Sequence, residues 1–567
     1  MWHRIVAWFR RGRSSRHRYQ AIDPDEIFLD SSNLPQFDRH QFEGRIERPI
    51  SQRTVFLFGG VFLIILAVFL FKSFSLQIDG GEVYAKRSEQ NRLRYTLIFG
   101  ERGIFTDRRG ELLAWNISDA SEPSFSKRAF TKRSGLSHLI GFLKYPSKDK
   151  YGFYYKVDFE GVDGAEKYLN EYVDPEHGLK IVEIDAKGDI QSESVLKRPK
   201  NGVRTELSID ARVSEKFYEL IGELSEDRGF EGGAGVLMDV QSGEILALAS
   251  FPEYRSQVLS DGTDRVAIKR FVDDPRKPFL NRATAGLYTP GSIVKPFIAV
   301  GALEEGIITP EKEIVSTGSI SIPNPYDASK PTVFKDWKAH GAVDMRAALA
   351  VSSDVYFYAI GGGFENQIGL GIANIEKYMR MFGFGREPGG NDFFGAAGTI
   401  PNPEWKMKNF GEAWRLGNTY HTTIGQYGFQ VTPMQAVRAI ATLANGGKLL
   451  EPQLTREAGD PVFQVVPVLD SSFQIVREGM RKAVLSGTAT GLNIPEVSVA
   501  AKTGTAELGT TRRFVNSWVV GFFPYESPRY AFAVIMEKGP RDNTIGALFV
   551  TRRLLEWMSV YTPEYLK

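Results

Sequence analysis

The sequence predicts a membrane-anchored protein of the α+β class, with one N-terminal transmembrane helix, a membrane-proximal α+β module and a larger unit in which helices flank an antiparallel sheet. Three observations predict this fold. An uncharged apolar run covers residues 55–71, short β-rich runs separated by Gly, Asp and Pro follow to about Lys200, and a helical pattern, a hairpin, more helices and two final strands come after it.

Composition limits the function classes. With 567 residues, 42% hydrophobic content and a formal net charge of +2, the chain can bury at least two cores and is not a broadly basic nucleic-acid binder. Cysteine is absent, which excludes thiolate catalysis, thiolate metal sites and disulfides. We therefore expect no nucleic-acid partner and a multidomain protein held together by packing.

The apolar run predicts a membrane span over residues 54–77. With its flank to Ile78 it is long enough for a tilted helix to cross a hydrocarbon core of about 30 Å, and it has no polar face for a soluble fold. A cleaved signal peptide fits less well, because a long polar segment precedes the run and no small-x-small signal follows it. The basic cluster from Arg10 to Arg18 predicts that the tail, residues 1–53, stays in the cytoplasm and that the rest is exported.

The exported part divides into a membrane-proximal domain at residues 78–205 and a second unit at residues 206–567. In the second unit the apolar residues from Val213 to Leu224 have helical spacing, and Gln241–Gly243 join two β-rich runs as a hairpin. Farther on, Thr432, Pro433 and Gln435 form the start signal of another helix.

Ser292 and Lys295 lie three residues apart, directly after Pro-Gly and before an apolar helical run. This spacing puts the hydroxyl and the amine on one face of the first helical turn. A serine is a weak nucleophile without an adjacent base, and a lysine can serve if burial and a nearby cation keep it neutral. The pair is thus a compact unit of a base and a nucleophile.

Ser-x-x-Lys alone is a weak signal, because it also occurs at Ser124, Ser147 and Ser194, where a solvated loop is the simpler interpretation. Ser292 differs because two further elements follow it in the order used by acyl-serine penicillin-recognising enzymes. The first is "SSD", with Ser352 and Asp354.

The second element is "KTGT", with Lys502, Thr503, Gly504 and Thr505 in a predicted strand. Here we expect Gly504 to let a substrate backbone approach, and the lysine and threonines to offer donors to a carboxylate. In isolation, the same letters would predict only a core strand with an exposed lysine.

These motifs, with "ERGIFTDRRGELLA", "YTPGSIVKPF", "NPEWK" and "AAKTGTAE", resemble class B penicillin-binding proteins, and most closely the penicillin-binding protein 2 group, the elongation transpeptidases of rod-shaped bacteria. The likeness covers most of the chain from about residue 54. It implies a pedestal domain of the dimerisation type and a transpeptidase domain with the penicillin-binding/β-lactamase-like fold. The division transpeptidases resemble the chain less.

The resemblance also implies roles. Ser292 would attack the penultimate D-alanine of a D-Ala-D-Ala stem peptide, Lys295 would take its proton, and Ser352 would relay a proton to the leaving D-alanine. Lys502 would support the relay and, with Thr503 and Thr505, bind the terminal carboxylate, while backbone N–H groups of Ser292 and Thr505 would form the oxyanion hole. The acyl group would pass to an amine on a neighbouring strand, and β-lactams would acylate the same serine.

Two departures concern the second motif and a metal site. Asp354 replaces the asparagine of most of the superfamily, and an ionised carboxylate cannot donate as an amide does, so pairing with a site lysine is the alternative. Some elongation enzymes have metal ligands between the first two motifs. Asp336 and His340 remain, but "DWKAHG" is shortened and no cysteine exists, so we expect no zinc and no cofactor.

Two other functions share the motifs. A β-lactamase or D,D-carboxypeptidase would hydrolyse the acyl-enzyme, and a membrane β-lactam sensor would signal with it. The anchor and the exported module favour cross-linking. Residues 78–205 are too short and β-rich for a glycosyltransferase domain, so the resemblance implies a separate SEDS-family polymerase and other elongation-complex proteins as partners. Gly59-Gly60 would let a partner helix approach closely, although ordinary membrane-helix composition explains these glycines equally well. It also implies the inner membrane as location, with the catalytic domain in the periplasm.

Overall fold

The computed structural model describes residues 51–567 except 121, 186–188, 325, 326, 328, 391, 392, 457–459 and 510; of 87–91 and 390 only the backbone is described. The basic cluster of residues 10–18 lies outside the described residues. Two compact units divide between Leu93 and Arg94.

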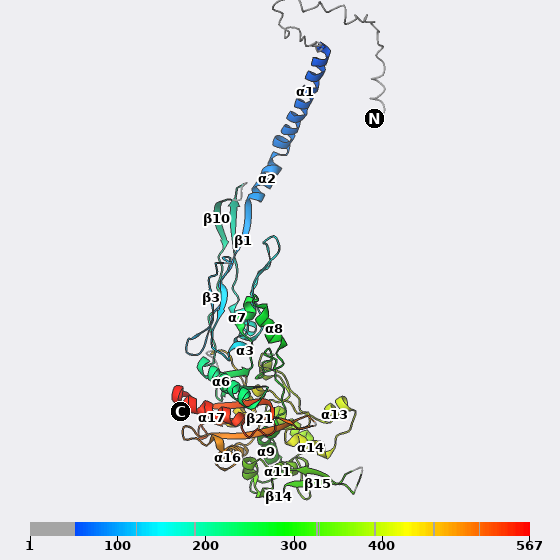
Figure 1. The fold of residues 1–567 in the computed structure, drawn as a ribbon, viewed down its shortest axis with the longest axis vertical. Coiled ribbons are helices and arrows are strands. Elements are labelled where there is room, and N and C mark those ends of the chain that lie inside the picture. The colour runs from blue at the N-terminus through cyan, green and yellow to red at the C-terminus, as the bar shows by residue number, and fades with distance from the viewer. Residues whose placement is uncertain are drawn as a thin grey trace, which may run out of the picture. The chain divides into compact units, whose positions relative to one another are not determined.

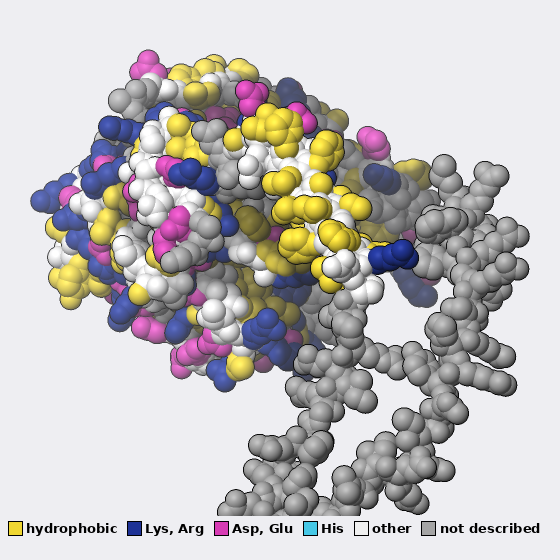
Figure 2. Space-filling view, turned by 90° about the horizontal axis from the view of Figure 1, so that it is seen from above, with side chains coloured by type: hydrophobic (Ala, Val, Ile, Leu, Met, Phe, Trp, Pro, Cys, Tyr) yellow, Lys and Arg dark blue, Asp and Glu magenta, His cyan; other side chains and the backbone are white. Residues whose placement is uncertain are grey.

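The described residues of the first unit are helical: α1 (Gln52–Phe74), a π-helical turn (Ser75–Asp79) and α2 (Gly81–Arg92). Gln52–Asp79, 28 residues whose most apolar stretch has a mean hydropathy of 2.8, is long and apolar enough to cross a membrane, and none of that stretch is buried against the protein. Figure 2 shows this band of apolar side chains on the helix surface. The protein is therefore membrane-anchored, and α1 covers most of the predicted span.

The second unit begins with small sheets. A three-stranded sheet has the order β1-β9-β10, a four-stranded sheet has the order β11-β2-β3-β4, and two hairpin-like pairs are β5-β8 and β6-β7. The elements of this region are β1 (Leu93–Ile98), β2 (Phe105–Thr106), β3 (Leu112–Ile117), β4 (Lys127–Phe130), α3 (Ser137–Ile140), β5 (Leu143–Lys144), β6 (Ser147–Lys148), β7 (Tyr154–Lys156), β8 (Glu160–Gly161), α4 (Gly164–Tyr168), α5 (Asn170–Val173), β9 (Gly178–Ile184), β10 (Ile190–Lys197) and β11 (Thr205–Glu206).

A buried ion cluster joins this region internally. The Glu166 carboxylate accepts from Arg102 Nε and from Arg128 Nε at 2.7 Å each, and all three side chains are at most 1% exposed. Each oxygen of the buried carboxylate thus has a guanidinium donor. A charge this deeply buried has to be paired and hydrogen-bonded in this way.

The larger part of the second unit is built on a five-stranded sheet of order β13-β12-β22-β21-β20, antiparallel throughout (Figure 1). Its strands are β12 (Gly232–Asp239), β13 (Ile245–Phe251), β20 (Ala500–Leu508), β21 (Phe514–Phe523) and β22 (Tyr530–Pro540). Successive side chains alternate between two cores: Trp518 and Val520 enter one, and Val519 and Phe523 enter the other. The antiparallel sheet flanked by helices is thus confirmed.

Helices cover both faces of this sheet. On one face lie α6 (Ala211–Arg228) and α17 (Ala547–Tyr561), and on the other lies α15 (Pro433–Ala444). The remaining elements are α7 (Ser256–Asp261), α8 (Arg265–Asp273), η6 (Gly291–Val294), α9 (Lys295–Glu304), β14 (Ile314–Ser316), β15 (Ser319–Ile322), β16 (Thr332–Lys335), β17 (Gly341–Val343), α10 (Met345–Val351), α11 (Asp354–Gly362), α12 (Gly371–Met381), η7 (Pro388–Gly390), α13 (Pro403–Phe410), α14 (Leu416–Thr423), β18 (Lys448–Leu450), β19 (Phe463–Val465), α16 (Asp470–Ser486), η8 (Thr490–Leu492) and η9 (Pro563–Tyr565).

The start of α15 follows from its sequence. Thr432 Oγ1 accepts from the Gln435 backbone N–H, and the Gln435 side chain accepts from the Thr432 N–H, each at 3.1 Å. Pro433 occupies the first turn, where its missing N–H costs no hydrogen bond. This reciprocal cap fixes the helix that packs across the centre of the sheet.

Candidate active site

Ser292 lies in the 3₁₀ turn η6, immediately before α9. Two contacts from other segments hold the approach to this turn: Trp518 Nε1 donates to the Thr289 carbonyl at 3.0 Å, and the Gly291 N–H donates to the Gly425 carbonyl at 3.0 Å. Pro296 lies in the first turn of α9, where no intrahelical donor is needed. The nucleophile predicted from sequence is thus on a short turn fastened to the sheet and to a second loop.

Gly504 of β20 lies against the Ser292 turn. A Cβ there would lie 2.9 Å from both Pro290 O and Ile293 Cγ2, so the missing side chain makes room for this turn. On the other side of the contact, Gly291 has φ +59°, and a Cβ on it would lie 3.0 Å from Thr505 O. Two glycines therefore let the turn approach the edge strand.

The Lys295 amine is fully buried and makes three contacts with the second motif. Its Nζ donates to the Ser352 carbonyl at 2.8 Å, to Ser352 Oγ at 3.3 Å and to Asp354 Oδ1 at 2.6 Å. It also lies 5.3 Å from the centre of the Phe357 ring, within cation–π range. In the described part of the chain no hydrogen bond joins Lys295 to Ser292 Oγ, so the resting amine is directed to Asp354.

Ser352 is the point where these groups meet. It ends α10 with φ +59° and ψ 40°, a left-handed conformation that costs a non-glycine residue about 1 kcal/mol or more. Its N–H donates to the Ala348 carbonyl, and its Oγ accepts from Lys502 Nζ at 2.7 Å as well as from Lys295. The strained backbone thus holds one hydroxyl between two amines.

Lys502 is the lysine whose pKa is lowered. Burial lowers its pKa well below the ordinary lysine value, the positive charge of Lys295 lowers it further, and the Asp354 carboxylate opposes both effects. Its Nζ also donates to the Thr503 carbonyl at 2.8 Å. Burial and a nearby cation, which we expected to act on Lys295, thus act on Lys502 of β20, and Lys295 is paired with the Asp354 carboxylate.

Asp336 organises the start of α11. Its Oδ2 accepts from Ser353 Oγ at 2.8 Å, from the Val355 N–H at 3.0 Å and from Ser316 Oγ at 3.1 Å. Burial raises the pKa of Asp336, but these hydrogen bonds outweigh it and leave the pKa below its ordinary value. His340 Nε2 is 3.5 Å from Asp336 Oδ1. The carboxylate therefore acts as a cap that positions Asp354 at the first position of the helix.

The threonines of the third motif lie on the strand beside this cluster. Thr503 Oγ1 is 2.7 Å from Thr488 Oγ1, which orients the hydroxyl, and Thr505 is exposed at the sheet edge. Direct hydrogen bonds join Lys295, Ser352, Asp354 and Lys502. Ser292 is connected to this group through the turn that leads into Lys295, and the two threonines are connected to it through β20, the strand that carries Lys502. Sequence reasoning did not identify Thr488, Trp518 and Gly425 as supporting groups, and no local pattern marks them.

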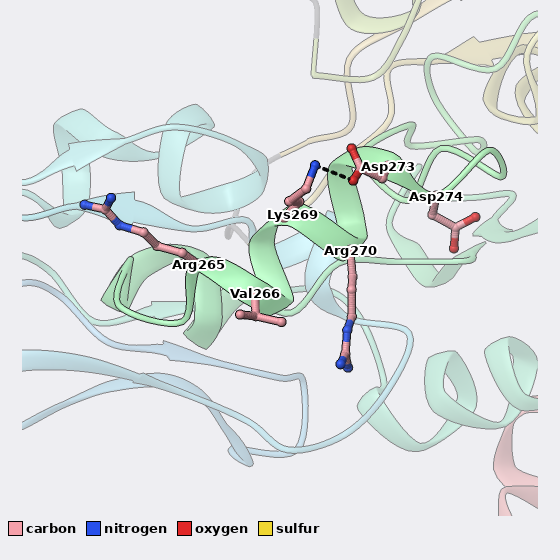
Figure 3. A pocket seen from close by; sticks show the side chains of 6 residues that line it. All are labelled: Arg265, Val266, Lys269, Arg270, Asp273 and Asp274. Atoms are coloured by element: carbon pink, nitrogen blue, oxygen red, sulfur yellow. Dashed lines mark ion pairs between the residues drawn. The ribbon is translucent and has the colours of Figure 1, made fainter.

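A pocket of about 560 Å³ contains none of these residues. It runs along α8 and is lined by Arg265, Val266, Lys269, Arg270, Asp273 and Asp274 (Figure 3). Lys269 and Asp273 form a surface ion pair at 2.7 Å. Helix α8 carries no buried polar group. The geometry therefore favours the cluster of Lys295, Ser352, Asp354 and Lys502 as the reactive site.

Comparisons with known proteins relate the chain to one family and to several relatives. The family described as penicillin binding protein transpeptidase domain matches residues 233–551. The peptidoglycan D,D-transpeptidase MrdA of Acinetobacter baumannii is 33% identical over 446 residues, which cover 73% of this chain and 63% of that protein. The MrdA of Haemophilus influenzae is 26% identical over 625 residues, covering 91% and 93%. The chain thus matches just under two thirds of the first relative and nearly all of the second.

A solved structure with the same fold is that of the penicillin-binding protein PBP2 from Helicobacter pylori in its complex with MreC. The TM-score is 0.69 at 25% sequence identity, and the match covers 83% of this chain and 99% of the other.

Proposed function

The chain belongs to the penicillin-binding protein transpeptidase family, as a class B member of the PBP2 type, and we propose that it cross-links peptidoglycan stem peptides during elongation through an acyl-enzyme on Ser292. One observation carries the proposal: Lys295 and Lys502 both donate to the Ser352 hydroxyl beside the Ser292 turn, and Lys295 also donates to Asp354. This arrangement supplies a nucleophile, a proton acceptor and a proton relay, which a serine D-Ala-D-Ala transpeptidase requires.

In the acylation step, Ser292 Oγ attacks the carbonyl carbon of the penultimate D-alanine and its proton passes to Lys295. The backbone N–H groups of Ser292 and Thr505 stabilise the oxyanion, which the close packing of the turn on β20 supports. The C–N bond to the terminal D-alanine then breaks, and the departing amine takes a proton from Ser352. Ser352 is replenished from the lysines that donate to it at 3.3 and 2.7 Å.

In the second step, an amine of a neighbouring strand attacks the ester carbonyl. The proton of that amine returns through Ser352 to Lys295, and the Ser292 oxygen leaves with a proton as the free hydroxyl. Thr503, Thr505 and Lys502 bind the substrate's terminal carboxylate in the first step, and Gly504 keeps the strand close to the nucleophile. β-Lactams acylate Ser292 because their strained amide occupies the position of the D-Ala-D-Ala bond.

Asp354 holds the resting state. The 2.6 Å ion pair keeps the Lys295 amine away from Ser292, and a general base must be neutral and within reach of the nucleophile. Substrate binding therefore has to release this amine and remove its extra proton, which can pass through Ser352 to the amine of Lys502. The carboxylate takes the place of an amide that would donate to the substrate carbonyl, and its role is to hold the lysine.

A labelled penicillin tests the nucleophile. Incubation of the purified full-length protein, proteolysis and mass spectrometry should recover the adduct on the peptide that contains Ser292. An adduct on another serine would overturn the assignment. Release of D-alanine from a pentapeptide donor without cross-linked product, even with a polymerase and an acceptor strand present, would indicate a hydrolase instead.

The domain arrangement extends the proposal. Residues 54–77 span the inner membrane with the tail in the cytoplasm, residues 78–205 form the pedestal, and residues 206–567 form the periplasmic transpeptidase domain. Protease added outside cells stripped of their outer layers should digest the chain beyond Ile78 and spare the tail. Protection of the catalytic unit would refute this orientation.

A separate polymerase supplies the glycan strands. The pedestal consists of short strands and helices, and nothing within 4 Å would meet a Cβ at Gly59 or Gly60 on α1, so a second membrane helix can approach there. We assign this partner to the SEDS glycosyltransferases, and the H. pylori complex with MreC supports further elongation-complex partners. With lipid-linked disaccharide-pentapeptide as substrate, cross-linked product should require both proteins, whereas glycan chains made by this chain alone would refute it.

A further inference from the structure

A second polar pocket lies apart from the motif residues. It has a volume of about 440 Å³ and is lined by Arg386, Glu387, Ala397, Arg438, Glu451 and Gln464. These residues come from the segment after α12, from α15 and from the β18–β19 hairpin. The volume is within the range of pockets that hold small molecules, about 300–1,000 Å³.

Arg438 is the buried cation of this pocket. Its side chain is 2% exposed, its Nε donates to the Leu450 carbonyl at 2.7 Å and its Nη2 donates to Glu451 Oε1 at 2.8 Å. Burial lowers the pKa of Arg438, the Glu451 carboxylate raises it, and the charge of Arg386 lowers it. The positive charge of Arg386 therefore repels that of Arg438. If the Arg438–Glu451 ion pair only anchored the hairpin, this repulsion would have no explanation.

Two polar atoms of the lining lack partners. Arg386 Nη2 donates to Gln464 Oε1 at 3.1 Å, but Arg386 Nε and Glu451 Oε2 are buried without a hydrogen bond. Only nine side-chain atoms in the described residues are in this condition, and two of them belong to this one pocket. One is a cationic donor and the other an anionic acceptor, and burial without a partner destabilises either of them.

We propose that this pocket binds the head group of an α-amino acid. The carboxylate would lie between Arg386 and Arg438, where it relieves their repulsion, and the ammonium would lie at Glu451, whose second oxygen is unpaired. A simple anion would leave the glutamate oxygen unpaired, and a simple cation would leave the arginine donor unpaired. The half-buried Arg386 side chain can rotate to meet the ligand.

Calorimetry with the full-length protein in detergent tests the site. D-alanine is the probe, acetate and methylamine are its two halves, and prior treatment with penicillin blocks the Ser292 groove. We expect saturable binding of D-alanine, and affinities at least about tenfold weaker for both half-probes, because each loses a charge-assisted contact.

Three variants locate the binding. Arg386→Gln and Glu451→Gln should each weaken D-alanine about tenfold or more. Arg380→Gln is the matched control: its guanidinium donates to the nearby Gly385 carbonyl and pairs with Glu376 but does not line the pocket, so binding should be unchanged. Absence of saturable binding, equal affinity for acetate, or full affinity in Arg386→Gln would overturn the proposal. If penicillin fails to label Ser292, the transpeptidase assignment fails, while the two glutamine variants still decide this one.

Discussion

Asp354→Asn removes one negative charge from the catalytic cluster and keeps the size of the side chain. The lost carboxylate oxygen lies 2.6 Å from Lys295 Nζ, with the lysine fully buried and Asp354 18% exposed. The same carboxylate raises the pKa of Lys502, against burial and the charge of Lys295. In the variant the pKa of Lys502 therefore falls further below the ordinary lysine value, and Lys295 is released from its ion pair.

The direction of the effect follows from the geometry. Without the carboxylate, burial and the charge of Lys295 act unopposed on Lys502, and both lower its pKa. Lys502 can take up a proton from the cluster only in its unprotonated form, so acylation falls as the pH drops through the pKa of Lys502. A lower pKa moves this acid limb to lower pH, and on that limb the variant should acylate several-fold faster than the wild type.

The assay is the second-order rate of acylation by a fluorescent penicillin, measured across the acidic and neutral range. The midpoint of the acid limb is the diagnostic quantity, because an amide at 354 can also change the plateau by donating to the substrate carbonyl. Asp273→Asn is the matched control, since it removes the carboxylate of a surface ion pair. A midpoint that stays in place, or moves to higher pH, would refute the reasoning.

Three further outcomes follow from the site and its scaffold. Ser292→Ala should abolish covalent penicillin labelling on gels while the circular dichroism spectrum is unchanged, and a labelled, folded variant would contradict the nucleophile assignment. Gly504→Ala places a Cβ 2.9 Å from Pro290 O, so it should displace the serine turn and slow acylation about tenfold or more. The free energy of unfolding should fall by about 1–3 kcal/mol. An unchanged acylation rate would show that the turn tolerates the added methyl group. Thr432→Ala removes the α15 cap and should cost about 1 kcal/mol in denaturant unfolding but leave the acylation rate of the folded protein unchanged.

Local signals in the sequence predicted a large part of this fold. The cap at Thr432 and Gln435 starts α15, the apolar spacing of residues 213–224 falls within α6, and residues 241–243 connect β12 to β13. These features depend on neighbouring residues, so a window of a few positions contains the information. The order of the three motifs similarly identified the family, because each motif is itself local.

The charge arrangement of the site could not be predicted in the same way. The contacts of Lys295 and Lys502 with Ser352 join positions 57 and 150 residues apart. Which lysine is buried beside a cation, and which meets a carboxylate, depends on the packing of α10, α11 and β20. The role of Gly504 has the same origin, since only the tertiary structure shows that its open face is filled by the Ser292 turn.

The geometry of Ser352 connects these long-range contacts to the chemistry. Its left-handed backbone ends α10 and is followed by the capped start of α11, so the position of its hydroxyl is set by two helices and not by the nucleophile turn. The turn is instead fastened to β20, β21 and the Gly425 loop. Nucleophile and relay therefore belong to different structural supports, and the two lysines carry the hydrogen bonds from the nucleophile's support to the relay. Lys295 directly follows the nucleophile turn, but it forms its ion pair with Asp354 at the start of α11. Release of that ion pair is therefore the step at which the two supports act together.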